Sequence, residues 1–252
     1  MSTISTSELR QRPVIAIDGP AGAGKSTLAA HLARKFGYLN LETGAMYRAL
    51  ALKAINSDLD LDEERELLNL CGSTTITLEP TREGNRVLLD GFDVSRRVRD
   101  ADVTAAASRA SVHPLVREWM VAHQRVLGAA GGVVMEGRDI GTAVFPDAEV
   151  KIFLDAAPEV RGNRRFRQVA SDVHELVPVT ETAVIEEMRS RDERDRNRAQ
   201  SPLKPAPDAF ILDSTAMSLD EVLAQSEEIV RGYLESKTSS LNHSANGLKT
   251  AE

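Results

Sequence analysis

The sequence predicts an α/β fold in which helices cover both faces of a parallel sheet. Short apolar runs of the kind found in buried strands alternate with segments of helical periodicity along most of the chain. A glycine-rich stretch separates the first apolar run from the first helix. Polar and charged residues follow several later runs, as expected where the carboxyl edge of a parallel sheet carries a site.

The first two strand and helix pairs follow each other closely. Val14–Ile17 is an apolar run typical of a strand buried on both faces, and Ser26–Phe36 is the helix after it. Tyr38–Leu41 is predicted as the second strand. The next helix, 43–55, has an apolar stripe at helical spacing, and we expect Thr43 to cap its N-terminus.

The pattern changes between about residues 62 and 100. A short helix is expected to end at Cys71-Gly72, and two β-rich runs follow, 74–78 and 86–90. The polar segment 79–85 joins them as a turn. An antiparallel pair within a parallel fold is most simply an inserted subdomain, here about 62–100.

The second half of the chain returns to strands and helices. Residues 102–130 are predicted as helix, with Pro114 tolerated near the start of a second piece and Gly131-Gly132 ending it. The remaining predicted strands are Val133–Met135, Val150–Leu154 and Phe210–Leu212, and the last helix is Leu219–Lys237.

Composition narrows the functional class. The chain has 252 residues, 42% of them hydrophobic, and a net charge of -7, which favours a globular protein without a general nucleic-acid surface. Cys71 is the lone cysteine, so the chain has no disulfide framework and suits a reducing, cytoplasmic compartment. We expect a disordered leader over 1–13, a disordered tail over 238–252 and no contact with a membrane, since no apolar run has spanning length.

The glycine-rich stretch fits the phosphate-binding loop pattern of glycine, four residues, then Gly-Lys-Ser. It lies between a strand and a helix, the context that the pattern requires. Glycines let successive N–H groups surround a polyphosphate, while Lys25 reaches the β- and γ-phosphates and Ser26 ligates Mg²⁺. The alternative is a glycine-rich turn with no ligand. The predicted ATP site is Gly19-Pro20-Ala21-Gly22-Ala23-Gly24-Lys25-Ser26-Thr27.

Two further motifs lie at predicted strand ends. Thr43-Gly44-Ala45-Met46-Tyr47-Arg48 begins a helix, and its arginine is placed to hold an acceptor anion; the alternative is an ordinary helix start. Glu136-Gly137-Arg138-Asp139 follows a buried strand, so Glu136 is placed to hold Mg²⁺ through water. The alternative for this motif is a surface salt-bridge cluster.

An arginine-rich segment, 189–198, places Arg191, Arg194, Asp195 and Arg198 on one helical face. A solvated, salt-bridged helix is the simple interpretation. The alternative is that these cations offset the repulsion between two polyphosphate substrates. A second basic cluster, with Arg161 and Arg164 among its members, lies in a segment of mixed charge, 157–180, which we interpret as a lid.

Taken together, these motifs resemble the bacterial cytidylate kinase family of nucleoside monophosphate kinases. The resemblance covers about residues 14–231 and rests on five motifs in order: 17–27, 43–48, 136–148, 151–156 and 191–198. It implies a phosphate-binding-loop kinase fold with a five-stranded parallel sheet, helices on both sides, and an inserted three-stranded antiparallel subdomain. The core is expected over 14–237.

The resemblance also implies roles for individual residues. Cytosine would be contacted by Ser108, Arg117 and Asp139, ribose by Arg191 and Asp195, and the acceptor phosphate by Arg48, Arg138 and Arg198, with Thr43 and Tyr47 also in the substrate site. Lys25, Arg138 and Arg198 would be the catalytic groups. Carboxylate and hydroxyl oxygens suit the N4 amino group of cytosine, whereas uracil presents a carbonyl there.

The expected activity is transfer of the ATP γ-phosphoryl group to CMP or dCMP by a monomer that uses Mg²⁺. Glu42 departs from the aspartate common in the family, and Lys25-Ser26 from the Lys-Gly-Thr of many monophosphate kinases. A shikimate-type kinase shares the loop but lacks the insertion. A regulatory ATPase or GTP switch is a further alternative, although a switch would need a guanine-reading Asn-Lys-x-Asp stretch, which this sequence lacks.

Overall fold

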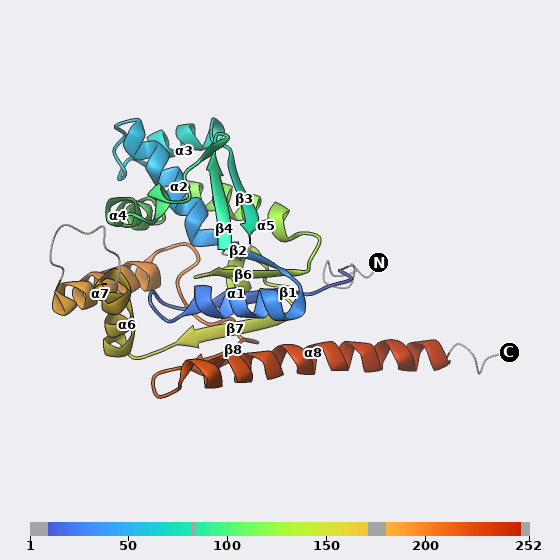
Figure 1. Ribbon diagram of the computed structural model, residues 1–252. Helices are drawn as coiled ribbons and strands as arrows, with labels where there is room; N and C mark the ends of the chain where they lie inside the picture. Colours follow the sequence, from blue (N-terminus) through green and yellow to red (C-terminus); the bar gives the residue numbers. More distant parts are fainter. Residues whose placement is uncertain (1–9, 82–83, 171–179, 248–252) are drawn as a thin grey trace.

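The computed structural model describes residues 10–81, 84–170 and 180–247. Its central sheet has five strands, and each pairing between them is parallel (Figure 1). The order across the sheet is β2-β6-β1-β7-β8. This confirms the predicted α/β class and parallel sheet. The strands are β1 (Val14–Asp18), β2 (Leu39–Glu42), β6 (Val133–Gly137), β7 (Val150–Asp155) and β8 (Phe210–Asp213).

The apolar runs form strands because both faces of the sheet are covered. All side chains of β1 and β6 are buried. Successive residues point to opposite faces, so Val14 and Ala16 join one core while Ile15 and Ile17 join the other. Burial on both faces favours continuous apolar runs over alternation. The sheet therefore separates two hydrophobic cores.

Each core lies under its own helices. Helices α1 (Lys25–Phe36) and α8 (Leu219–Gly247) cover one face of the sheet, and α2 (Thr43–Asn56) and α5 (Pro114–Gly128) cover the other. The glycine after α1 has φ 65° and its N–H donates to the carbonyl of Ala33, which closes the helix in the left-handed conformation that glycine favours. Helices therefore flank the sheet on both sides, as predicted.

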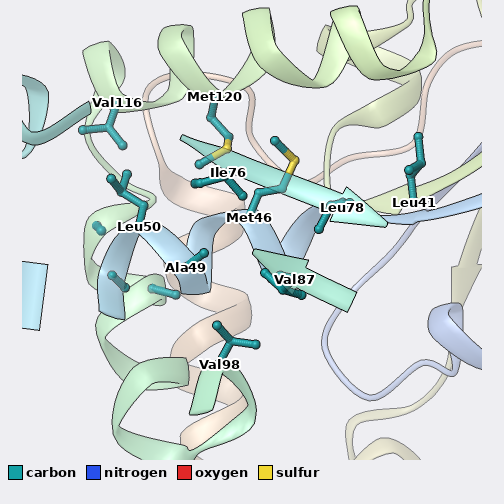
Figure 2. Close-up of a cluster of buried hydrophobic side chains, with 14 of the residues drawn as sticks. Leu41, Met46, Ala49, Leu50, Ile76, Leu78, Val87, Val98, Val116 and Met120 are labelled. Atoms are coloured by element: carbon teal, nitrogen blue, oxygen red, sulfur yellow. The ribbon is translucent and has the colours of Figure 1, made fainter. Parts of the chain in front are cut away.

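The segment between α2 and α5 contains a second, antiparallel sheet of three strands in the order β3-β4-β5. Its elements are α3 (Glu64–Gly72), β3 (Ile76–Thr81), β4 (Gly84–Leu89), β5 (Phe92–Asp93), η2 (Arg97–Arg99) and α4 (Ala101–Ala110). Figure 2 shows Ile76, Leu78 and Val87 of this sheet packed around Met46 of α2. The sheet thus shares the core of α2.

The residue pattern predicted two antiparallel strands here with a turn over 79–85. In the structure β3 instead runs on to Thr81 and β4 begins at Gly84, so the connection is shorter. Pro80 pairs with Asn85 in this ladder, and β3 is an edge strand, where a proline is tolerated. The family resemblance implied the third strand, β5, which is too short for a periodic signal.

Helices α6 (Pro158–Ala170) and α7 (Glu181–Asn197) pack against each other beside the carboxyl ends of the strands (Figure 1). The hydroxyl of Thr180 accepts a hydrogen bond from the N–H of Ala183 and caps α7. Part of the predicted lid, 157–180, is therefore helix α6. Residues 171–179 of that lid lie outside the described residues.

Both ends of the chain differ from the sequence expectation. Residues 10–13, assigned to a disordered leader, are placed: buried Arg10 forms ion pairs with Asp147 and Glu149 at 3.1 and 3.5 Å. The last helix was predicted to end at Lys237, but α8 continues to Gly247. Residues 1–9 and 248–252 lie outside the described residues. Within the described ranges, no helix has the length and apolar character needed to span a membrane.

Candidate active site

The phosphate-binding loop connects β1 to α1 at the carboxyl edge of the sheet. Gly19, Gly22 and Gly24 have φ of 149°, 72° and 101°, which side chains rarely allow. A Cβ on Gly19 would lie 2.0 Å from the carbonyl oxygen of Leu154, so the loop passes close against β7. This backbone brings the start of α1 to the centre of the sheet edge, where its free N–H groups favour an anion.

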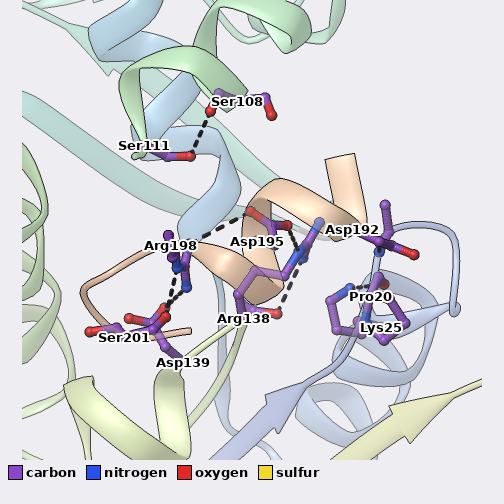
Figure 3. Close-up of polar contacts among 12 residues, drawn as sticks. Pro20, Lys25, Ser108, Ser111, Arg138, Asp139, Asp192, Asp195, Arg198 and Ser201 are labelled. Carbon is purple, nitrogen blue, oxygen red and sulfur yellow. Dashed lines mark hydrogen bonds and ion pairs between the residues drawn. The ribbon is translucent and has the colours of Figure 1, made fainter. Parts of the chain in front are cut away.

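Lys25 is buried in the first turn of α1. Its ammonium group donates a hydrogen bond to the carbonyl of Pro20 at 2.6 Å (Figure 3). Burial, and next the positive charge of Arg138, lower the pKa of Lys25. A group whose positive charge is disfavoured by its surroundings gains from a nearby polyphosphate, because the anion offsets both effects. The surroundings of Lys25 therefore favour the binding of an anionic ligand.

The two oxygen ligands predicted for Mg²⁺ lie together. The hydroxyl of Ser26 donates to Oε1 of Glu136 at 2.6 Å. They meet because β6 pairs with β1, whose loop leads into α1, and Glu136 is buried at the sheet edge. Magnesium prefers oxygen ligands and keeps waters and phosphate oxygens in its shell, so two protein oxygens are sufficient. This pair fits a magnesium ion that arrives with a triphosphate.

Arginines and carboxylates gather where β6 ends and α5 and α7 approach it (Figure 3). Arg117 of α5 donates to Asp139. Arg138 donates to Asp195 of α7 at 3.1 Å. Arg198 lies 3.6 Å from Asp139 and 3.7 Å from Asp195. Guanidinium groups therefore surround both carboxylates, and they have further N–H donors for an anion.

Arg138 acts electrostatically both on the phosphate-binding loop and on Arg191 of α7. Its positive charge lowers the pKa of both Lys25 and Arg191, in each case after the larger effect of burial. For Arg191 the pKa falls to about 10. Cations held this close repel one another, and a polyanion bound among them relieves that repulsion. The arrangement thus favours two phosphate-bearing ligands at adjacent positions.

Several predicted substrate residues have buried polar atoms with no partner. In the part of the chain that the structure describes, the hydroxyls of Tyr47 and Ser108 make no hydrogen bond, nor does one terminal nitrogen of Arg198. Burial raises the pKa of Tyr47 to about 12, so its hydroxyl keeps its proton. Unpartnered buried donors are costly in a folded protein, and a ligand that accepts from them offsets that cost.

Arg48 and Thr43 make contacts that differ from the sequence expectation. Arg48 donates to Glu42, the residue that departs from the family pattern. Thr43 does not cap α2; it is the first helical residue, and its hydroxyl donates to the carbonyl of Glu136 at 2.7 Å. The threonine therefore links α2 to β6 at the sheet edge, a contact between distant segments that local helix signals do not encode.

A buried ion pair that the sequence did not predict is hydrogen-bonded to the phosphate-binding loop. Arg161 of α6 and Asp192 of α7 lie 2.6 Å apart and are both buried. Arg161 also donates to the carbonyl of Ala21 at 2.9 Å, and Asp192 accepts from the N–H of Ala21 at 3.3 Å. The pair thus holds both polar groups of one loop residue. Asp192 lies on the same helix as Arg191 and Asp195.

We expect Asp192→Asn and Arg161→Met each to raise the KM for ATP about tenfold, because each leaves a buried charge and part of the loop backbone unpaired. In a double-mutant cycle the two effects should be strongly non-additive. The exposed pair of Arg189 and Glu159 joins the same two helices at 2.8 Å and provides the control. Arg189→Met raising the ATP KM as much as Asp192→Asn would contradict a specific effect on the loop.

Comparison with known proteins gives matches over most of the chain. Residues 15–232 match a family model described as cytidylate kinase. The cytidylate kinase of Aeromonas hydrophila is 48% identical over 84% of this chain and 90% of its own. That of Geobacillus kaustophilus is 47% identical over 88% and 98%. Among solved structures, a shikimate kinase from Acinetobacter baumannii matches at 14% identity and a TM-score of 0.42, over 92% of this chain and 99% of that one.

Proposed function

This chain belongs to the cytidylate kinase family, and from that membership we propose that it transfers the γ-phosphoryl group of ATP to CMP or dCMP, giving ADP and CDP or dCDP. The observation that carries this proposal is the arginine and carboxylate cluster at the end of β6. Asp139 and Asp195 lie there among Arg117, Arg138 and Arg198, next to the phosphate-binding loop.

The cluster supplies the chemistry that cytosine recognition needs. A carboxylate accepts from the N4 amino group, and a guanidinium donates to the N3 and O2 acceptors. Asp139 and Arg117 are a buried, hydrogen-bonded pair of these two groups. Ser108 adds a buried hydroxyl with no partner among the described residues. We assign base recognition to these three side chains.

The acceptor phosphate and the ribose are assigned to the α2 and α7 side of the site. Arg48, Arg138 and Arg198 provide guanidinium forks for a phosphate, and Asp195 with Arg191 is placed for the ribose. Thr43 and Tyr47 complete this part of the site. The hydroxyl of Tyr47 and Nη2 of Arg198 support this assignment, since both atoms are buried and neither makes a hydrogen bond among the described residues.

On the donor side, the loop from Gly19 to Thr27 surrounds the triphosphate of ATP, with Lys25 at the β- and γ-phosphates. Ser26 and Glu136 would hold magnesium, Ser26 directly and Glu136 through water, and the ion would neutralise developing charge on the phosphates. Their hydrogen bond at 2.6 Å, which puts the two oxygens side by side, supports this assignment.

The reaction needs positioning and charge stabilisation rather than a general base. An acceptor phosphate near neutral pH is already largely dianionic and attacks the γ-phosphorus in line with the leaving ADP oxygen. Lys25, Arg138 and Arg198 supply fixed positive charge where negative charge spreads in the transition state. Because Lys25 and Arg198 are buried away from water, their interaction with that charge is strong.

The site supports two other functions less well. A shikimate-type kinase offers no use for the Ser108, Arg117 and Asp139 set. A regulatory ATPase would have no need for an acceptor site lined with paired arginines. We also infer that the enzyme acts as a monomer, since donor and acceptor residues all come from one chain, and that it works in the cytoplasm, a reducing compartment that suits a chain with a lone cysteine.

The reaction type can be tested with ATP labelled at the γ-phosphate. With CMP present, the label should appear in CDP, and without CMP it should stay in ATP. Label released mainly as inorganic phosphate, whether or not CMP is present, would identify an ATPase instead. Label transferred to shikimate but not to CMP would support the shikimate-type alternative.

A further inference from the structure

Asp18 is a buried carboxylate that the proposed mechanism does not use. It is the last residue of β1 and directly precedes the phosphate-binding loop, and only 4% of it is exposed. Its Oδ1 accepts from the N–H of Ile140 at 2.8 Å, and its Oδ2 accepts from the N–H of Gly141 at 2.7 Å. Both donors belong to the segment that follows Asp139.

That segment begins beyond the end of the sheet. The ladder between β1 and β6 ends where Asp18 pairs with Gly137, so Arg138 and Asp139 lie beyond the sheet. The chain then enters a one-turn helix, η3 (Ile140–Val144), whose first N–H groups need acceptors. Asp18 supplies them from a neighbouring strand. The first two N–H groups after Asp139 are therefore both held by this one carboxylate.

A side chain at Gly141 would contact both Asp18 and a neighbouring lysine. A Cβ on Gly141 would lie 3.4 Å from Oδ2 of Asp18 and 3.1 Å from the side chain of Lys151. Burial raises the pKa of Asp18 to about 6, while the two backbone hydrogen bonds oppose that shift. Lys25 favours the ionised carboxylate, and Asp139 disfavours it. Ionisation is what lets both oxygens accept, because a protonated acid presents a donor to one of the two N–H groups.

We propose that Asp18 is a positioning residue for recognition of the acceptor base: it holds the backbone at Ile140 and Gly141 and thereby fixes the direction of Asp139. It also joins this acceptor segment to the donor loop, which begins at the next residue. The proposal rests on the proposed function, since it concerns selectivity between CMP and UMP. Asp18 itself touches neither substrate.

Asp18→Asn keeps the size of the side chain but turns one acceptor into an N–H₂ donor that faces a backbone N–H. We expect the ratio of kcat/KM for CMP to that for UMP to fall about tenfold, as for the loss of one charge-assisted hydrogen bond. The KM for ATP should change less than the KM for CMP. Backbone hydrogen exchange in a peptide covering residues 138–145 should become faster.

Glu149→Gln is the matched control. Glu149 is also a buried carboxylate that accepts from a backbone N–H of β1, that of Val14 at 2.8 Å, but at the opposite end of the strand. The Glu149→Gln variant should have a lower thermal stability but an unchanged ratio of kcat/KM for CMP to that for UMP. Should Asp18→Asn fail to fold, Gly141→Ala tests the same contact from the other side, with a smaller fall in the ratio.

The proposal is overturned if Asp18→Asn, or Gly141→Ala in its place, leaves both the selectivity ratio and the exchange of 138–145 as in the wild type. It is also overturned if Glu149→Gln lowers the ratio equally, because the effect is then one of general stability. Failure of the proposed function is a separate result: the wild-type protein would then phosphorylate neither pyrimidine nucleotide, whereas the exchange measurement would still report on the contact.

Discussion

Replacing Lys25 with alanine is expected to lower kcat by a factor on the order of 100 to 1,000 or more, the range found when a single preorganised charge-stabilising group is removed. The fold should survive the change. Burial lowers the pKa of Lys25, which means that the folded protein disfavours its charge, and its hydrogen bond is to the carbonyl of Pro20 rather than to a carboxylate. Alanine leaves no buried acid unpaired.

Lys25→Arg separates charge from shape, because it keeps the charge but not the compact ammonium group that fits against Pro20. It should also be severely impaired. Steady-state rates with saturating CMP, together with circular dichroism to check the fold, measure both variants. Near-normal turnover of folded Lys25→Ala would rule out the donor site assigned here.

Replacing Asp139 is expected to have the largest effect on substrate choice. Asp139→Ala should weaken CMP far more than ATP, since it removes the acceptor for the N4 amino group. An unpaired buried polar group costs about 1–3 kcal/mol, so the CMP affinity should fall about tenfold to a hundredfold. Isothermal titration with each nucleotide measures the two affinities separately.

Asp139→Asn is the sharper variant, because Asp139→Ala leaves the buried Arg117 and Arg198 without their shared carboxylate. An asparagine amide can donate to the C4 carbonyl of uracil and accept from its N3–H. We therefore expect Asp139→Asn to lose CMP activity and to gain relative preference for UMP. Unchanged CMP affinity in both variants would refute the role of Asp139 in reading the base.

Much of the fold could be predicted because its signals are local. Fully buried strands give continuous apolar runs, as in Val14–Asp18, and the loop after it has a fixed spacing of glycines, lysine and serine. The start of α5 is marked by a proline at its first helical position, Pro114. The strand order was not predicted from these signals, because it depends on which runs pair across the sheet.

Where the structure differs from the sequence prediction, the difference has a physical reason. Thr43 resembles a cap in sequence, but its hydroxyl is used by the carbonyl of Glu136, which is far away in the chain. Arg10 lies in a polar segment without periodicity and is held by Asp147 and Glu149, so local pattern could not place it. The end of α8 lacks a glycine or proline near Lys237 that would stop the helix there.

In the candidate site, too, the sequence predicted some of the residues and not others. Motifs identified the loop, the Glu136 to Asp139 segment and the arginines of α7, and the structure brings them to one sheet edge. Asp18 and Asp192 lie within the motifs 17–27 and 191–198, but the motifs did not assign a role to them or to Arg161. Their importance lies in contacts with backbone groups of Ile140, Gly141 and Ala21, which only a folded chain brings near. Sequence spacing does not contain this information.

The most direct measurement is ADP release by the wild-type protein, in a coupled assay with ATP, magnesium and each nucleoside monophosphate in turn. CMP and dCMP should drive rapid release, UMP much less, and AMP, GMP and shikimate little above the rate without an acceptor. Equal release with every acceptor, or fast release with none, would contradict an acceptor site built to read cytosine.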